Sequence, residues 1–265
     1  MKTSTWLATN SPDPAVDRAA RRVLESTGRI SFDDDPASLS RTRTAIRGAQ
    51  IDDRRAAPLI REFGLFARIV RAFSIEPLTS VEFLDSTVVH PLGADVKRTA
   101  ELAFGTAART ARRNVAILDD GALRDAARDA ARDYPQIFVH EFPAGEWGPL
   151  VERGAEEIEV VIAASDLGVA HVMGGAAVAP DELRGEVAIF GPALGDAIDP
   201  GAALECPYAL VLAGAQLLEF LGEGPVGDRL VKAVKRAVAE GVLPRRLGGT
   251  ATIDEMTEAV LGVMK

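Results

Sequence analysis

The sequence predicts an α/β protein built on a mixed, largely parallel sheet. Along most of the chain, short apolar or alternating segments typical of strands are separated by segments with the spacing of amphipathic helices. Strands that alternate with helices favour a parallel sheet, because each helix returns the chain to the edge where the next strand begins. Hydrophobic residues make up 47% of the chain, which is enough for a buried core.

In the N-terminal third we expect a strand over 4–9 and then a helix over 15–27 with Pro14 at its start. The polar stretch ISFDDDPASLSRTR that follows is expected to be a loop. A helix over 57–65 and a strand over 66–73 complete this part.

The middle of the chain predicts further alternation. The expected strands are 80–89, 114–118, 137–142 and 158–164, and the expected helices are 94–112, 122–134 and 147–153. In the first of these helices, Ala100, Phe104 and Ala107 share one face by their spacing. The alternation of strands and helices therefore continues through this part.

The C-terminal part predicts a strand over 187–190 and three helices. The first helix, over 208–221, is so apolar that it must be mostly buried. The second, over 226–241, is amphipathic and is ended by Gly241. The last helix begins at Thr252, which with Glu255 three residues later makes a capping box.

Composition excludes several classes of protein. The net charge of −9 disfavours nucleic acid or an anionic membrane as the main partner. No apolar run is long enough to span a bilayer, and the N-terminus lacks the apolar core of a signal peptide. A single cysteine, Cys206, fits a reducing compartment. We expect a soluble cytoplasmic protein, and the abundance of Ala, Arg and Gly is typical of high-GC bacterial genes.

Several motifs resemble the isocitrate/isopropylmalate dehydrogenase family of metal-dependent, β-decarboxylating dehydrogenases. The C-terminal LGGTATIDEM is similar to the family's GGTATTxEM. PAVDRAARRVL, LIREFGLFARI, KRTAELAFGTAARTARRNVAIL and AIFGPALGDAID resemble other family segments in the family's order. The matches extend over nearly the whole chain, which is shorter than typical members.

The resemblance implies a two-domain fold around a mixed, largely parallel sheet. Residues 1–68 and 180–265 would form a discontinuous nucleotide-side domain, and residues 69–179 a central domain that carries the dimer interface. The partner would be a second copy or a paralogue, and a small carboxylate is a possible ligand. The cofactors implied are NAD(P) and Mg²⁺ or Mn²⁺.

Most residues that this chemistry requires are replaced at the matching positions. The substrate arginines, whose planar forks would clamp carboxylates, fall on Ile60, Val70 and Leu84. The catalytic lysine falls on Asp120, and the segment with the catalytic tyrosine is deleted. On the cofactor side, Cys206 stands where the family has Asn, so the identity of any cofactor stays open.

Three aspartates would hold the metal in the family, because Mg²⁺ and Mn²⁺ prefer anionic oxygen ligands. The first falls on Ala144. The other two meet a deletion: in one alignment they fall on Val169 and Met173, and in another Asp166 survives as a metal ligand. Asp166 is alternatively a helix cap. Even the favourable alignment keeps one metal carboxylate of three.

Three further sets of residues are candidates for a site. Asp119 and Asp120 follow a strand and could act as a general acid and base, or simply form a solvated turn. Arg68 and Arg71 are candidates for binding a substrate anion, because they lie on a strand that lines the family's cleft. Alternate residues of a strand face opposite sides, so at most one of Arg68 and the neighbours of Val70 points into the cleft. Gly249, Thr250, Ala251 and Thr252 could contact a nucleotide or form a tight turn.

Three functions remain open, in order of preference. The first is a degenerate member that acts as a noncatalytic subunit or a binding protein. The second is a repurposed enzyme that performs a non-redox elimination or decarboxylation with Asp119, Asp120 or Asp166. The third is a working NAD(P)- and Mg²⁺- or Mn²⁺-dependent dehydrogenase of a malate-type 2-hydroxy acid, with relocated ligands.

Overall fold

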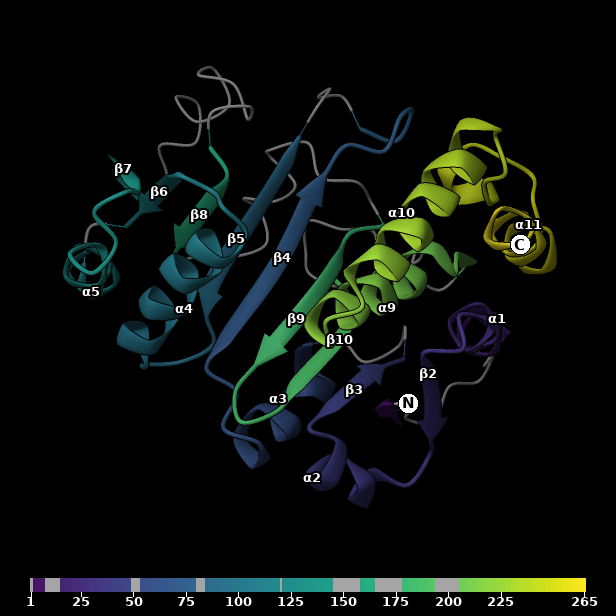
Figure 1. Cartoon of the computed structure of the whole chain (residues 1–265), viewed down its shortest axis with the longest axis horizontal. Helices are drawn as coiled ribbons and strands as arrows, with labels where there is room; N and C mark the ends of the chain where they lie inside the picture. The colour runs from purple at the N-terminus through teal and green to yellow at the C-terminus, as the bar shows by residue number, and fades with distance from the viewer. Residues whose placement is uncertain are drawn as a thin grey trace.

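The computed structural model describes residues 2–7, 15–48, 53–79, 84–119, 121–144, 158–164, 178–193 and 205–265. A single ten-stranded sheet in the order β2-β1-β3-β10-β9-β4-β5-β8-β6-β7 passes through the whole molecule (Figure 1). The strands are β1 (Lys2–Leu7), β2 (Ile30–Asp33), β3 (Thr44–Arg47), β4 (Ala67–Phe73), β5 (Asp85–Pro91), β6 (Asn114–Leu118), β7 (Phe138–Phe142), β8 (Val160–Ala163), β9 (Pro180–Arg184) and β10 (Ala188–Pro192).

The prediction of a mixed, largely parallel sheet is confirmed. Neighbouring strands are parallel at both ends of the sheet, from β2 to β10 and from β5 to β7. The antiparallel pairs are confined to the centre, where β9 lies between β10 and β4, and β4 pairs with β5. The two parallel halves therefore run in opposite directions and meet at β9 and β4.

Most of the described helices cover one face of this sheet. The helices are α1 (Ala15–Ser26), α2 (Leu39–Thr42), α3 (Asp53–Glu62), α4 (Val96–Arg109), α5 (Ala122–Ala131), α9 (Tyr208–Phe220), α10 (Gly224–Ala239) and α11 (Ile253–Met264). Helices α4 and α5 pack over one half of the sheet, and α1, α9, α10 and α11 over the other half. Helices α2 and α3 pack on the opposite face.

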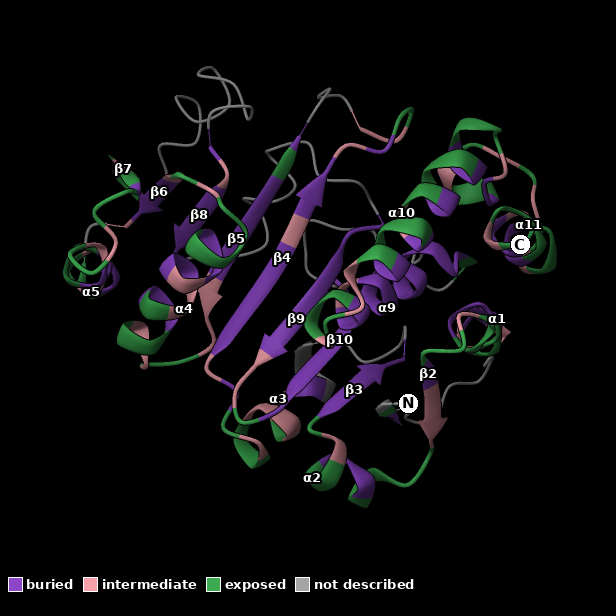
Figure 2. Cartoon of the chain, viewed as in Figure 1, coloured by how far each residue is buried: buried purple, intermediate pink, exposed green. Residues whose placement is uncertain are grey.

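Burial follows the apolar patterns in the sequence. Figure 2 shows buried residues along the central strands and in α9, whose sequence YALVLAGAQLLEF is apolar on nearly every side. Thr252 caps α11 and makes the predicted capping box with Glu255. Gly241, just after α10, has a φ of +75°, a conformation that glycine adopts without steric cost. None of the helices in the described ranges is long and apolar enough to cross a membrane.

One prediction about an element is wrong, and two strands were missed. The stretch 30–43 is not a loop, because it contains β2, a short 3₁₀ helix (Pro36–Ser38) and α2. Strands β3 and β9 were not expected. Strand β9 reads Pro-Asp-Glu-Leu-Arg, which has low strand propensity. It forms a central strand because arginines from this and neighbouring strands neutralise Asp181 and Glu182.

The remaining differences concern boundaries. Helix α3 ends at Glu62, before Gly64 with its φ of +55°, whereas the sequence predicted a helix to residue 65. Strand β5 begins at Asp85, and the first residues of the predicted strand 80–89 lie outside the described residues. The predicted helix 147–153 also lies outside them.

Candidate functional site

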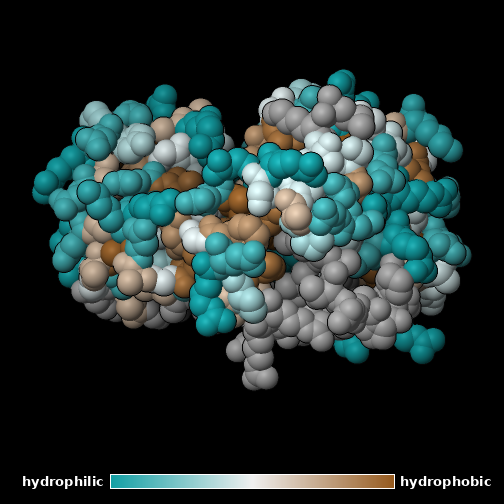
Figure 3. Space-filling view, turned by 90° about the horizontal axis from the view of Figure 1, so that it is seen from below, coloured by the Kyte–Doolittle hydropathy of each residue, from teal (hydrophilic) through white to brown (hydrophobic). Residues whose placement is uncertain are grey.

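A groove lies over the centre of the sheet, between α4 on one side and α9 and α10 on the other. Its floor is formed by the middle strands β4, β5 and β9. Figure 3 shows a hollow between the part of the molecule that carries α4 and α5 and the part that carries α9 and α10, with hydrophobic residues near its base. The antiparallel centre of the sheet is thus the place where a ligand can reach the strands.

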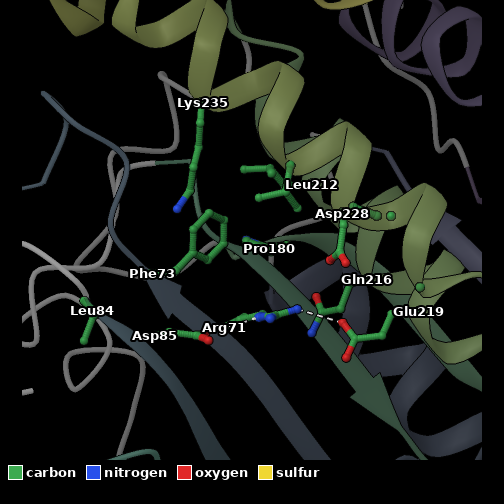
Figure 4. A pocket seen from close by; sticks show the side chains of 14 residues that line it. Arg71, Phe73, Leu84, Asp85, Pro180, Leu212, Gln216, Glu219, Asp228 and Lys235 are labelled. Atoms are coloured by element: carbon green, nitrogen blue, oxygen red, sulfur yellow. Dashed lines mark hydrogen bonds and ion pairs between the residues drawn. The ribbon is translucent and has the colours of Figure 1, made fainter. Parts of the chain in front are cut away.

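An ion pair between floor and wall divides this groove. Nη1 of Arg71, on β4, lies 2.7 Å from Oε2 of Glu219, on α9 (Figure 4). Arg71 also lies 3.6 Å from Asp85, which in turn pairs with Arg112 at 2.9 Å. Two cations and two carboxylates therefore balance each other across the groove.

On one side of this ion pair is a hollow of about 160 Å³, here called the α10 hollow. Residues that line it include Phe73, Pro180, Leu212, Gln216, Asp228 and Lys235. Figure 4 shows Lys235 and Asp228 extending from α10 toward the sheet, with Phe73 and Pro180 below them. The Lys235 ammonium lies 5.3 Å from the centre of the Phe73 ring, close enough for a cation–π interaction. The hollow thus combines an apolar base with charged groups at its rim.

On the other side is a hollow of about 410 Å³, here called the α4 hollow. Residues that line it include Thr87, Thr106, Arg109, Arg112, Glu182 and Arg184. Glu182 is 5% exposed, and its burial raises the pKa of its carboxyl group although the paired Arg184 and nearby Arg109 act in the opposite direction. Glu182 is thus a buried carboxyl group at the edge of this hollow, held by its ion pair with Arg184.

The opposite face of the sheet carries a second, buried ionic cluster. Arg47, at the end of β3, reaches across β10 to Asp181 on β9, with Nη2 and Oδ1 2.6 Å apart. Nε of Arg68, on β4, lies 3.6 Å from the other carboxylate oxygen of Asp181. All three side chains are at most 6% exposed. This cluster joins four adjacent strands and has little access to solvent.

The structure separates the two arginines that the sequence singled out as anion-binding candidates. Arg71 points into the groove, on the face where Ile69 and Phe73 also lie. Arg68, three residues earlier, points to the other face and pairs with Asp181, because strand side chains alternate. The two therefore cannot clamp one ligand together.

Two positions that the family resemblance equates with substrate arginines are buried. Val70 is 1% exposed and Leu84 is 2% exposed, and both belong to one apolar cluster with Ala72, Val88 and Ala179. Ile60, the third such position, is half-buried on α3 and packs against the cluster around Leu65. The side chains of Val70 and Leu84 are therefore part of the apolar core.

Of the acid–base candidates, the structure describes Asp119 alone. Oδ2 of Asp119 accepts hydrogen bonds from the backbone N–H groups of Gly121 and Arg124, at 2.8 and 3.0 Å, at the start of α5. It therefore satisfies donors that the first turn of a helix leaves open. Asp120 and the metal-ligand candidate Asp166 lie outside the described residues, as do Val169 and Met173.

The Gly249–Thr252 segment forms a closed turn before α11. The N–H groups of Gly249 and Ala251 donate to the carbonyls of Pro244 and Leu243, and that of Thr252 donates to Glu255. A Cβ on Gly249 would overlap the Leu243 carbonyl, so the close approach requires glycine. These three N–H groups are therefore engaged within the fold.

The described residues do not fit the implied metal. Within the described ranges, no three His, Cys, Asp or Glu side chains come together in a way that could hold a metal ion. Cys206, at the position matched to a cofactor-side asparagine, is fully buried, and its burial raises the pKa of the thiol to about 12. Neighbouring Tyr208 donates its hydroxyl to the Val242 carbonyl at 2.7 Å. Both side chains serve the packing of α9.

Sequence reasoning singled out Arg68 and Arg71 but missed other residues that give the groove and the buried cluster their charge. Asp228 and Lys235 lie on a helix that was expected to be a surface helix, and no local pattern shows that they face a hollow. Arg47 and Asp181 lie on the two strands that were not expected. A charged residue that ends an apolar run, as in Thr-Ala-Ile-Arg, is the one signal that could have indicated Arg47.

Comparisons with known proteins place these features in context. No protein-family model matches the sequence. The chain is 31% identical over 160 residues to an isocitrate/homoisocitrate dehydrogenase of Thermus thermophilus, covering 57% of this chain and 48% of the relative. It is 30% identical over 189 residues to a 3-isopropylmalate dehydrogenase of Novosphingobium aromaticivorans, covering 63% and 54%.

A third relative is the regulatory subunit 1 of the mitochondrial NAD isocitrate dehydrogenase of Arabidopsis thaliana, 30% identical over 161 residues, covering 56% of this chain and 44% of that protein. The chain thus spans about half the length of the curated relatives it matches. A crystal structure of isocitrate dehydrogenase from Methylococcus capsulatus superimposes with a TM-score of 0.79 at 19% identity, covering 99% of each chain. This similarity confirms the predicted fold.

Proposed function

Because this chain is a divergent relative of the isocitrate and isopropylmalate dehydrogenases, we propose that it keeps their fold without their metal-dependent oxidative decarboxylation. Its role is that of a noncatalytic subunit or a small-molecule-binding protein. The relative from Arabidopsis thaliana, which is named a regulatory subunit, supports a role of this kind within the family.

The packing of Val70 and Leu84 is the observation that carries this proposal. Both lie in an apolar cluster at positions that the resemblance assigns to carboxylate-binding arginines. A substrate carboxylate placed against them would be desolvated without a cation, which costs on the order of several kcal/mol. The nearest cation on the same face of the strand as Val70 is no substitute, because Arg68 is buried with Asp181. The adjacent Arg71 points to the opposite face and pairs with Glu219.

Acid–base chemistry without redox is the weaker alternative. Asp119 already accepts two backbone hydrogen bonds at the start of α5, so its Oδ2 is engaged in holding the first turn of that helix. The alternative would therefore depend on Asp120 and Asp166. A working dehydrogenase with relocated ligands is the third candidate, and the assay below tests it directly.

We propose that the partner binds to the central part of the chain, residues 69–179. We divide the chain into a unit formed by residues 1–68 and 180–265 and a central unit of residues 69–179, with one boundary inside β4 and the other at the start of β9. The central unit would contact either a second copy or a related subunit. Size-exclusion chromatography with light scattering tests whether the chain self-associates. A monomer at all concentrations would contradict contact with a second copy.

The proposed loss of activity is tested by following NAD(P)H absorbance with Mn²⁺ and a panel of isocitrate, homoisocitrate, 3-isopropylmalate and tartrate. We expect no turnover with either nucleotide. We also expect no rise in melting temperature with Mn²⁺ plus any of these acids, because a ligand of the native state would stabilise it by mass action. Turnover that a chelator abolishes would overturn the proposal and establish the working dehydrogenase.

A further inference from the structure

We propose that the α10 hollow binds a small α-amino acid with an apolar side chain. The hollow has an apolar base, one cation and one carboxylate that are left over after its other charges are paired, and a buried amide acceptor. A zwitterion with an apolar substituent complements all of these features. Of the positions that the resemblance assigns to substrate arginines, Leu84 lines the hollow and Ile60 and Val70 do not, and the proposal holds whether or not dehydrogenase activity remains.

The charges of the hollow leave two groups for a ligand. Arg71 and Arg112 balance Glu219 and Asp85. In the described part of the chain, no oppositely charged group lies within ion-pair distance of Lys235 or Asp228, and both side chains line the hollow. They are seven residues apart on α10, so they project from the same face about 10 Å apart along the axis.

A buried acceptor identifies the end of the hollow that would bind an ammonium group. Oε1 of Gln216, on α9, is buried and accepts no hydrogen bond within the described residues. Figure 4 shows Gln216 and Asp228 pointing into the same part of the hollow. An ammonium group has three donors and can satisfy both acceptors at once. The ligand carboxylate would then pair with Lys235, which lies above Phe73.

The size and lining of the hollow define the ligand's side chain. Phe73 and Leu212 are buried hydrophobic residues that line it together with Pro180. Its volume of about 160 Å³ is close to that of a cavity of about 150 Å³ that is known to take up benzene in another protein. A branched aliphatic side chain of four carbons fits such a space, whereas a dinucleotide does not.

The same charges disfavour the acids that the relatives' names suggest. A malate-type dicarboxylate would find one cation, Lys235, left over for its two carboxylates, and its second carboxylate would lie near Asp228. Like charges at close range in a partly desolvated site repel strongly. The α10 hollow should therefore discriminate between an amino acid and a dicarboxylic acid.

Isothermal titration calorimetry of the whole chain with L-leucine tests this proposal. Three probes that each lack one feature serve as controls: 4-methylpentanoate has no ammonium, isoamylamine has no carboxylate, and glycine has no apolar side chain. L-malate is the fourth probe. We expect L-leucine to bind at least about tenfold more tightly than each of them, equivalent to about 1.4 kcal/mol.

Variants on α10 assign the binding to this hollow. Asp228→Asn and Lys235→Met should each weaken L-leucine binding by at least about tenfold, because each removes a charge-assisted hydrogen bond. Lys232→Met, on the same helix at an exposed position that does not line the hollow, should leave binding unchanged. All three positions are exposed, and thermal melts would check that the variants fold.

Three results would overturn the proposal. The first is no heat of binding with L-leucine, L-valine or L-phenylalanine at millimolar concentration. The second is binding of L-malate or glycine as tight as that of L-leucine. The third is L-leucine binding that Asp228→Asn and Lys235→Met leave unchanged, which would place the ligand elsewhere on the protein.

Discussion

Arg47 and Asp181 form a fully buried ion pair across an intervening strand, with Nη2 and Oδ1 2.6 Å apart and side-chain exposures of 1% and 0%. Arg47 belongs to β3 and Asp181 to β9, and β10 lies between them in the sheet. The arginine passes over Gly191 of β10, where a Cβ would lie 2.6 Å from its Nε. A glycine on the middle strand therefore allows the two outer strands to be linked.

Breaking this pair should strongly destabilise the protein. We expect Asp181→Asn to lower the free energy of unfolding by about 3–5 kcal/mol, because it leaves buried arginine charge without its carboxylate. Urea denaturation measures the loss. Arg236→Met is the control, since it breaks the exposed Arg236–Glu240 pair and should cost less than about 0.5 kcal/mol. Equal losses in the two variants would show that burial of the Arg47–Asp181 pair does not matter.

The passage over Gly191 makes a separate prediction. Gly191→Ala should destabilise the fold by roughly 1–3 kcal/mol, because the added methyl group overlaps the Arg47 side chain in a packed core. Gly93→Ala is the control, since a Cβ there meets no atom within 4 Å. In an Arg47→Ala background, which is itself less stable, Gly191→Ala should cost less than it does in the parent, because the side-chain atoms that the methyl group meets are gone. An equal cost in both backgrounds would argue against this contact as the cause.

Variants of two threonines in the turn before α11 distinguish a structural role of this segment from a nucleotide-binding role. Thr252→Ala should cost about 1 kcal/mol, because Thr252 caps α11 through the N–H of Glu255. Thr250→Ala, at an exposed position two residues earlier, should change stability little. Chemical denaturation measures both. A drop in NAD(P) affinity with Thr250→Ala at unchanged stability would instead support nucleotide binding by this segment.

The pH dependence of the same cap follows from Glu255. Hydrogen bonds from the N–H and the hydroxyl of Thr252 lower the pKa of the Glu255 carboxyl in the folded state. Its contribution to stability is therefore present above the unfolded-state pKa and is lost as the pH falls through the lowered folded-state pKa. We expect Glu255→Gln to be less stable than the parent at pH 7 and equally stable at the acid end. A constant difference across this range would contradict the assignment.

The lone cysteine should be unreactive in the native state. Cys206 is fully buried, and burial raises the pKa of its thiol to about 12, so almost no thiolate forms at pH 8. We expect a thiol reagent such as DTNB to react in urea and not in buffer. Because the folded-state pKa is raised, stability should also fall as the pH rises above about 9. Rapid labelling of the native protein would show that Cys206 is more accessible than its burial in the structure indicates.

How far the sequence predicts an element depends on where that element's partners lie. The strand 114–118 and the cap at Thr252 were predicted to the residue, because the pattern that specifies each one is local. Strand β9 was not predicted, because Asp181 becomes compatible with a central strand only when Arg47, 134 residues away, neutralises it. The groove was missed for the same reason, since Glu219 meets Arg71 across 148 residues.

The amino-acid sequence alone therefore determined the α/β class, most of the helices and strands, and the relationship to the dehydrogenases, and it led to the expectation that their arginines fall on Ile60, Val70 and Leu84. Only the tertiary structure decided that Arg68 and Arg71 point to opposite faces, that Asp119 caps α5, and that Lys235 and Asp228 face a hollow. Local patterns record backbone periodicity, whereas the environment of a charged side chain depends on which distant segments pack against it.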